Sequence, residues 1–330
     1  MPPLFRPASA AVCACMALAC ASPAQAHCWV GSRFFPATLT VDDPCVADEM
    51  SLPTGAIYRT GDDPALREID LSVELSKRIT DNFGVSIGPA WSNLRPAGGP
   101  SVGGWQNLDT TFKYQFLTLP ESEVAMSIGT SIEWGRTGNL SVGADKFSTI
   151  APTVWFGKGF GGLPPALAWA RPFAVTAQIS YAVPMWSRNV TVSVDPDTGA
   201  VSSAMTRNPQ FLIWGGTLQY SLPYLRANVI DLGLPDAVSR LTPIVEAQFR
   251  SPAGNSFMPD VSLKTTGTVQ PGAIWVGDRF QVAAEAIVPI NRSSGKGVGA
   301  MAQLHLYLDD MFPTTYGRPL LALATAGGAR

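Results

Sequence analysis

The chain has 330 residues, of which 23 are Lys or Arg and 25 are Asp or Glu, so its net charge is −2. This near-neutral balance gives no basic surface for nucleic acid, and no nucleic-acid partner is expected. Charged residues make up 15% of the chain, against about 25% in ordinary soluble domains. Low charge with many Gly and Pro residues favours a strand-rich protein whose outer face is uncharged.

Residues 1–26 have the pattern of an export signal. The apolar stretch 10–21 is too short to span a bilayer, and Ala24-Gln25-Ala26 is a small-x-small cleavage site, which makes His27 the first mature residue. The alternative is a lipoprotein signal with Cys20 as the lipidated residue. Because no later run approaches the ~18 apolar residues of a membrane helix, we expect the periplasm, the outer membrane or the medium.

Two cysteines, Cys28 and Cys45, remain after the predicted cleavage. In an oxidising compartment a lone pair of cysteines favours a disulfide over a metal site. The sequence therefore predicts that Cys28 and Cys45 are bonded and tie down the N-terminal segment 27–50.

From about residue 69 to residue 308 the chain repeats one unit, in which two alternating apolar/polar runs are joined by a short turn and followed by a longer polar loop. Ile69, Leu71 and Val73, for example, alternate with Asp70 and Ser72. Side chains of a strand point to opposite faces with a period of two, so each run forms a ribbon with one apolar and one polar face. The predicted strands are 51–60, 68–78, 83–91, 105–116, 123–134, 147–157, 172–183, 210–222, 241–249, 268–276, 280–289 and 298–308.

The connections between these strands alternate in length, as in bacterial barrels with short periplasmic turns and long outer loops. This alternation requires an upward strand before 68–78, and 51–60 is the only room for it. The resulting even count of twelve puts both chain ends in the periplasm. Within the connections, the sequence predicts a hairpin in the outer loop 184–209 and a short amphipathic helix at 224–230.

The apolar parity marks a lipid-facing side and the polar parity a lumen, which leans acidic. As in known barrels, tryptophans near strand ends are expected to form interfacial girdles. The candidate lumen-lining residues are Asp70, Glu74, Asp109, Lys113, Glu133, Glu246, Glu285 and His305. They indicate either a hydrophilic, weakly cation-preferring path or a structural network, in which the acids pair with Lys113, Arg78 and one another and select nothing.

Catalytic and cofactor motifs are missing from the sequence. It shows no metal-ligand spacing, no phosphate-binding glycine loop and no nucleophile elbow, so no cofactor, metal or catalytic residue is expected. Of the two histidines in the mature chain, His305 lies between two leucines without a serine in its strand. It is expected to be a polar lumen group, and the alternative is a lipid-modifying enzyme with a serine on a neighbouring strand.

Three passages carry a resemblance to a known family: Leu75–Val85, Asn107–Phe116 and Leu304–Pro313. They resemble the first hairpin, an "Asp, then Lys-Tyr" strand and the closing strand of the phenol-degradation meta-pathway type of outer-membrane β-barrel transporters. The resemblance implies uptake of small, hydrophobic or aromatic compounds and transfers no binding residue. One departure is that the chain continues past Leu308 to Arg330, whereas such barrels usually end on an aromatic residue of the last strand.

The sequence therefore predicts an all-β, closed antiparallel transmembrane barrel of about twelve strands in the outer membrane of a Gram-negative bacterium. The barrel would span 51–312 and be followed by a tail, 313–330, while segment 27–50 would sit in the lumen as a plug, by analogy with fatty-acid-type uptake barrels. Expected partners are outer-membrane lipid, the barrel-assembly machinery and a small-molecule solute. The predicted function is a passive channel or transporter, and the alternatives are a filled structural or adhesion barrel and a lipid-modifying barrel enzyme.

Overall fold

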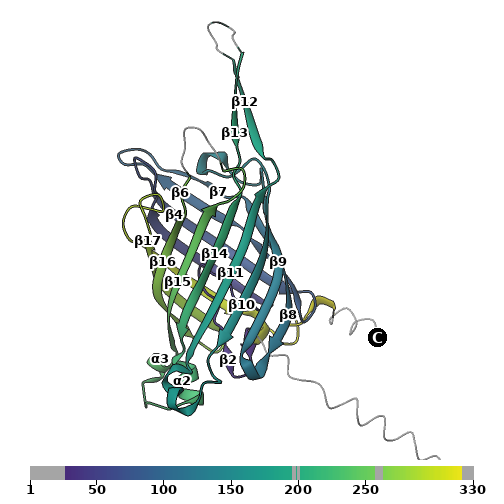
Figure 1. The fold of residues 1–330 in the computed structure, drawn as a ribbon, viewed down its shortest axis with the longest axis vertical. Helices are drawn as coiled ribbons and strands as arrows, with labels where there is room; N and C mark the ends of the chain where they lie inside the picture. Colours follow the sequence, from purple (N-terminus) through teal and green to yellow (C-terminus); the bar gives the residue numbers. More distant parts are fainter. Residues whose placement is uncertain (1–26, 195–197, 199–200, 257–262, 322–330) are drawn as a thin grey trace, which may run out of the picture.

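The computed structural model describes residues 27–194, 198, 201–256 and 263–321. The predicted export signal 1–26 and the end of the predicted tail, 322–330, lie outside the described residues. The chain forms a closed antiparallel barrel (Figure 1), as the alternating pattern predicts. In the described part of the chain, no helix has the length and apolarity needed to cross a membrane.

The barrel wall is built from strands that follow one another in sequence. These are β3 (Glu49–Arg59), β4 (Arg67–Arg78), β5 (Phe83–Gly88), β6 (Ala90–Arg95), β7 (Val102–Trp105), β8 (Leu108–Leu119), β9 (Val124–Trp134), β10 (Thr149–Gly159), β11 (Phe173–Pro184), β14 (Phe211–Tyr220), β15 (Leu241–Pro252), β16 (Thr266–Val276), β17 (Phe280–Pro289) and β18 (Gly299–Tyr307).

These segments occupy twelve positions around the wall. β5 and β6 both pair with β4, and they are one strand interrupted at Pro89, which has no N–H to donate. β7 and β8 likewise follow each other opposite β6 and β5. The wall closes where β18 pairs with β3 and β3 with β4. The weakly patterned segment 51–60 is therefore a strand, and the predicted even count is confirmed.

Three prolines that weaken the strand predictions are accommodated on the outer face of the barrel. Pro152, Pro243 and Pro271 lie inside β10, β15 and β16, and all three are exposed. The ladder from β10 to β11 lapses at Pro152, and that from β16 to β17 lapses at Pro271. The missing proline donors therefore interrupt the pairing locally without ending the strands.

The two ends of the barrel differ: most of the long connections lie at one end, called the loop end, and most of the short connections at the other, called the turn end. The loop end carries a long hairpin of β12 (Arg188–Val194) and β13 (Val201–Arg207), which projects beyond the wall (Figure 1). The turn end carries α2 (Leu222–Asn228) and α3 (Asp236–Ser239). Both the hairpin and the helix match the sequence predictions. The sequence assigns the loop end to the outside and the turn end to the periplasm.

The predicted division into an apolar outside and a polar inside is also observed. Outward residues such as Leu71, Ile128 and Ile179 are 44%, 51% and 49% exposed, whereas inward Glu246 and Gln281 are fully buried. The outer face therefore matches the lipid-facing surface of a membrane barrel.

Most of the tryptophans near strand ends are exposed on the outer face, as the girdle prediction requires, and Trp105, Trp134 and Trp214 are examples. The girdle prediction is wrong for Trp155, which is 2% exposed because its place in β10 has the inward parity.

The chain after β18 turns back onto the barrel. α4 (Leu308–Met311) follows the last strand directly, and the segment after it lies against the start of the β4–β5 turn. Lys77 Nζ donates to the carbonyls of Tyr316 and Arg318, and Arg78 Nη2 donates to that of Gly317. Residues 316–318 are thus fixed at the turn end.

Candidate functional site

Residues 27–48, called the plug below, run through the lumen before the first barrel strand. A small hairpin of β1 (Trp29–Val30) and β2 (Arg33–Phe34) begins the plug near the turn end, where β2 is visible inside the wall (Figure 1). The predicted disulfide between Cys28 and Cys45 is present, with a Cα–Cα distance of 5.3 Å. Both cysteines are buried with Val30 and Phe35 against the barrel residues Ala125 and Ala174.

Inward side chains of five strands bind the backbone of the plug. A chain that crosses a lumen without secondary structure needs such partners, because buried peptide groups without hydrogen bonds are costly. Gln115 Oε1 on β8 accepts from Val46 N at 3.1 Å, and Gln178 Oε1 on β11 accepts from Asp42 N at 3.0 Å. The other contributors are Ser127 on β9, Glu246 on β15 and Gln281 on β17.

Glu246 makes the densest of these contacts. Its Oε1 accepts from Leu39 N at 2.8 Å, and its Oε2 accepts from Thr40 N at 2.9 Å and Val41 N at 2.7 Å. One fully buried carboxylate therefore binds three consecutive amides of the plug. Three convergent N–H donors favour the ionised form of a carboxyl group. Hydrogen bonds to an ionised acceptor are about twice as strong as neutral ones, so Glu246 is a principal anchor.

Glu285, on β17, lies on the same side of the lumen as Glu246. A Cβ at Gly272 on the intervening strand β16 would lie 2.4 Å from Glu285 Cγ, so the glycine makes room for this side chain. Glu285 is 5% exposed, and neither of its carboxyl oxygens has a hydrogen-bond partner among the described residues. It therefore contributes no hydrogen bond to the plug, and its charged neighbour in the lumen is Glu246.

Lys113 holds the plug from the opposite wall. Its Nζ donates to Asp42 Oδ2 at 2.5 Å and to the carbonyl of Asp43 at 2.9 Å, and it lies 4.9 Å from the centre of the Trp155 ring. Glu74 lines a cavity of about 20 Å³ beside Lys113 and Asp42, which is room for about one water molecule.

A buried ion pair fixes the plug at the turn end. Arg33 Nε donates to Glu123 Oε2 at 3.2 Å, and the guanidinium also donates to the carbonyls of Pro172 and Arg171. The guanidinium lies 3.6 Å from the centre of the Tyr224 ring. Burial raises the pKa of Tyr224, and its hydroxyl donates to Glu123 Oε1 at 2.9 Å.

Sequence reasoning missed Arg33 and Glu123 as functional candidates. One signal was available: Arg33 is the single Lys or Arg of segment 27–50. An isolated cation in a segment that must be buried needs an acid, but the sequence does not indicate which acid.

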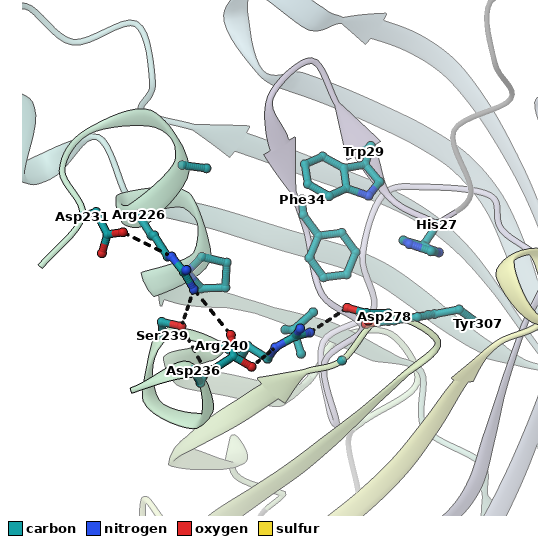
Figure 2. Close-up of a pocket in the computed structure, with 14 residues that line it drawn as sticks. His27, Trp29, Phe34, Arg226, Asp231, Asp236, Ser239, Arg240, Asp278 and Tyr307 are labelled. Carbon is teal, nitrogen blue, oxygen red and sulfur yellow. Dashed lines mark hydrogen bonds and ion pairs between the residues drawn. The ribbon is translucent and has the colours of Figure 1, made fainter. Parts of the chain in front are cut away.

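A cavity of about 620 Å³ lies between the base of the plug and the helices of the turn end (Figure 2). Trp29 and Phe34 face it from the plug. On the other side, Arg226 pairs with Asp231 and Asp236, and further along Arg240 pairs with Asp236 and Asp278. These acids are largely exposed, so the pairs contribute little to stability.

The loop end of the lumen stays open above the plug. One cavity of about 390 Å³ is lined by three acids, Asp109, Glu133 and Asp145, and by Arg250. A second cavity, of about 500 Å³, includes Asp70 in its wall, and residues 39–40 of the plug border it. Three predicted lumen residues, Asp70, Asp109 and Glu133, therefore line this open half, whereas Lys113 and Glu246 hold the plug.

The lumen acids on this side have local partners. Asp70 accepts from Tyr58 Oη at 2.9 Å and from Ser92 Oγ at 2.5 Å, and Glu133 accepts from Asn107 Nδ2 at 2.8 Å.

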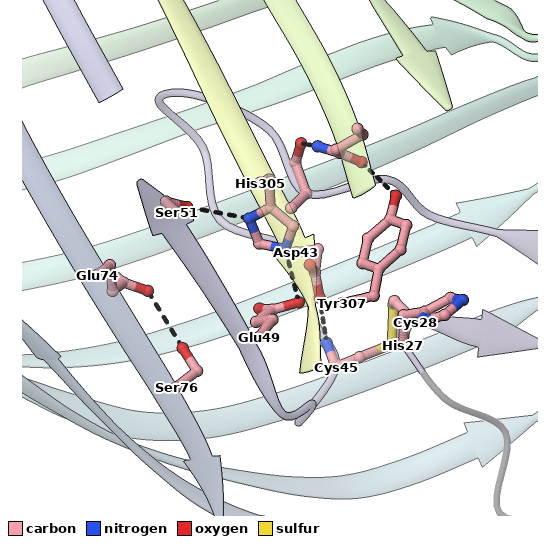
Figure 3. Close-up of polar contacts among 12 residues, drawn as sticks. His27, Cys28, Asp43, Cys45, Glu49, Ser51, Glu74, Ser76, His305 and Tyr307 are labelled. Atoms are coloured by element: carbon pink, nitrogen blue, oxygen red, sulfur yellow. Dashed lines mark hydrogen bonds and ion pairs between the residues drawn. A yellow bond between two sulfur atoms is a disulfide. The ribbon is translucent and has the colours of Figure 1, made fainter. Parts of the chain in front are cut away.

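His305 lies in the lumen between a serine and a glutamate (Figure 3). Its Nδ1 is 2.9 Å from Ser51 Oγ, and its Nε2 is 3.2 Å from Glu49 Oε2. The order Ser–His–Glu is the one that activates a serine nucleophile. His305 is 3% exposed, however, and the cavity beside Glu49 is the one of about 20 Å³, which has no room for a lipid or another substrate.

No protein-family model matches the chain, so the expected phenol-degradation type gains no support, and no curated protein matches it. Solved structures do. The NanC porin shares 9% identity with a TM-score of 0.43, and the KdgM porin in complex with disordered oligogalacturonate shares 8% with 0.42; each match covers 78% of this chain and 98% of the porin. The translocator domain of the autotransporter NalP from Neisseria meningitidis shares 8% with 0.43, covering 78% and 87%. At these identities and scores the likeness does not extend to function.

Proposed function

We propose that the chain is an outer-membrane barrel that conducts small polar solutes and is closed by its own plug. The observation that carries this proposal is the contrast between the two halves of the lumen. The turn-end half holds a bonded chain segment, while the loop-end half holds cavities of about 390 and 500 Å³. A purely structural barrel has no need of an open polar vestibule that ends on a separate segment.

The lining of the vestibule favours hydrophilic solutes with a preference for cations. Asp109, Glu133 and Asp145 face one arginine, Arg250, so carboxylates outnumber guanidinium groups in the smaller cavity. Clefts lined by one sign of charge raise the local concentration of the opposite ion. This lining does not favour the hydrophobic or aromatic solutes that the family resemblance implies.

Conductance in planar bilayers tests the proposal. Deletion of residues 27–47, which keeps β3 complete, is expected to turn a closed barrel into one with steady current. The matched control is deletion of the hairpin β12–β13, which removes a segment of similar length outside the lumen and is expected to leave the barrel closed. Heat-modifiability on a gel verifies that each variant is a folded barrel. An absence of current from the folded plug-deleted barrel would favour the filled structural barrel instead.

In the plug-deleted barrel, the double substitution Asp109→Asn with Glu133→Gln tests the solute preference. It is expected to shift the reversal potential in a KCl gradient toward zero. An unchanged reversal potential would show that these carboxylates select nothing.

A further inference from the structure

Three metal-ligating side chains meet where the plug begins and the barrel ends. His27 is the first described residue of the plug, and Asp309 and Asp310 lie in α4, directly after the last strand. Their ligand atoms lie within 4.8 Å of one another. The side chains of His27 and Asp309 are 13% and 3% exposed, and that of Asp310 is 28% exposed.

Two nitrogen atoms of His27 face the same carboxylate. The backbone N lies 2.9 Å from Asp309 Oδ2, and Nδ1 lies 3.4 Å from Asp309 Oδ1. Nitrogen and oxygen ligands bind transition metals at about 2.0–2.2 Å. Two ligand atoms of one ion therefore lie about 2.8–3.6 Å apart when the ligand–metal–ligand angle is about 90–109°. Both observed separations fall within this interval.

The chemistry of the backbone N depends on the predicted cleavage after Ala26. Cleavage there converts the amide N of His27 into a free α-amine. An α-amine and the Nδ1 of the same residue form a chelate, because they belong to one residue and reach one ion without further chain ordering. An amide nitrogen within the uncleaved chain binds a metal only after it loses its proton, a step that the α-amine does not need.

The surroundings hold the imidazole in the orientation that such a chelate requires. His27 Nε2 lies 3.0 Å from Asp310 Oδ2, and metal-bound histidines usually donate their second ring nitrogen to a carboxylate in this way. The ring stacks on Tyr307 at 4.2 Å and meets the edge of Phe34 at 5.6 Å (Figure 2 labels these three residues). Nδ1 is therefore left to face Asp309.

Asp309 also has a second cationic neighbour, Arg78. Arg78 Nη2 lies 4.0 Å from Asp309 Oδ2, farther than the His27 nitrogen on that oxygen.

We propose that the mature chain binds a divalent transition metal, with Cu²⁺ preferred, through the α-amine and Nδ1 of His27 and the carboxylate of Asp309. Asp310 acts as a positioning residue for the imidazole. Nitrogen donors with one carboxylate suit copper, nickel and zinc, and Cu²⁺ is the tightest of these by the Irving–Williams order. The bound metal ties the first residue of the plug to α4. The site rests on cleavage after Ala26 and is independent of the proposed channel function.

The test uses the full mature barrel extracted from outer membranes in detergent. Mass spectrometry determines its first residue, and Cu²⁺ binding is then measured by isothermal titration against glycine as competitor. The expected result is one Cu²⁺ per chain, an electron paramagnetic resonance spectrum with nitrogen hyperfine structure, and a higher Tm with CuCl₂, since a ligand that binds only the folded state stabilises it.

Two variants separate the site from a general effect on folding. Insertion of Gly-Ser-Gly-Ser before His27 keeps every side chain but removes the α-amine from the site, and it is expected to weaken Cu²⁺ binding about 100-fold, on the scale of losing a ligand-shell interaction. Asp278→Asn, an exposed acid in the neighbouring cavity, is the matched control and is expected to bind like the wild type. A first residue other than His27, or equal binding by the inserted and wild-type chains, would overturn the proposal.

Discussion

Replacement of Glu246 by Gln is expected to open the barrel. The substitution keeps the size of the side chain but removes its charge and turns one acceptor oxygen into a donor. Three backbone N–H groups donate hydrogen bonds of 2.7–2.9 Å to the carboxylate. Those of Thr40 and Val41 share Oε2, and that of Leu39 uses Oε1. One or two of the three amides therefore lose their acceptor, depending on how the new amide group is turned.

The size of the effect follows from these bonds. A hydrogen bond to a charged group contributes about 1.5–3 kcal/mol net, so the loss of one or two gives roughly 3 kcal/mol against the docked plug. Because about 1.4 kcal/mol is a tenfold change in an equilibrium constant, the ratio of displaced to docked plug is expected to rise about 100-fold. Single-channel recording at neutral pH measures this ratio as the open time divided by the closed time.

Glu133→Gln is the matched control for this experiment. It makes the same change from carboxyl to amide on an inward glutamate of β9, whose carboxyl accepts from Asn107 Nδ2 at the loop end. We expect its open probability to stay near that of the wild type. If both variants open equally, or if neither does, the anchoring role of Glu246 is refuted.

Three further predictions concern the attachment of the plug. Arg33→Met leaves Glu123 buried without its cation and is expected to lower the free energy of unfolding by about 3–5 kcal/mol. Chemical denaturation measures this loss. The double variant Arg33→Met with Glu123→Gln should recover part of it. Replacing Cys28 and Cys45 by Ser is expected to cost roughly 3 kcal/mol in the same assay, whereas a cost near zero would contradict a constraining role. Burial disfavours the charged form of Asp309, but hydrogen bonds from His27 and the charge of Arg78 hold the pKa of this carboxylate below its ordinary value in the folded chain. The ionised carboxylate therefore stabilises the fold above its unfolded pKa, about 3.9. This stabilisation is lost as the pH falls through the lower folded pKa. Thermal unfolding between pH 6 and 2 should show this loss, and Asp309→Asn should flatten the decline.

The barrel could be predicted from the sequence because its causes are local. A period of two places Leu71 outside and Asp70 inside whatever the rest of the chain does, and short turns alternating with long loops set the strand count. The same parity places Glu246 and His305 on the inward face, and both side chains are buried. Prediction was weaker where one residue changes the ladder, as at Pro89, which divides the predicted strand 83–91 into β5 and β6.

Only the tertiary structure decided which partner each lumen residue contacts. The sequence makes Glu246 an inward acid, but its binding of residues 39–41 joins positions 205 to 207 apart in the chain. The pairing of Arg33 with Glu123, and the meeting of His27 with Asp309, depend in the same way on closure of the wall around the plug. Alternation along a strand fixes which face a side chain takes. It carries no information about which distant segment lies opposite that face, because that is set by how all the strands close around one lumen.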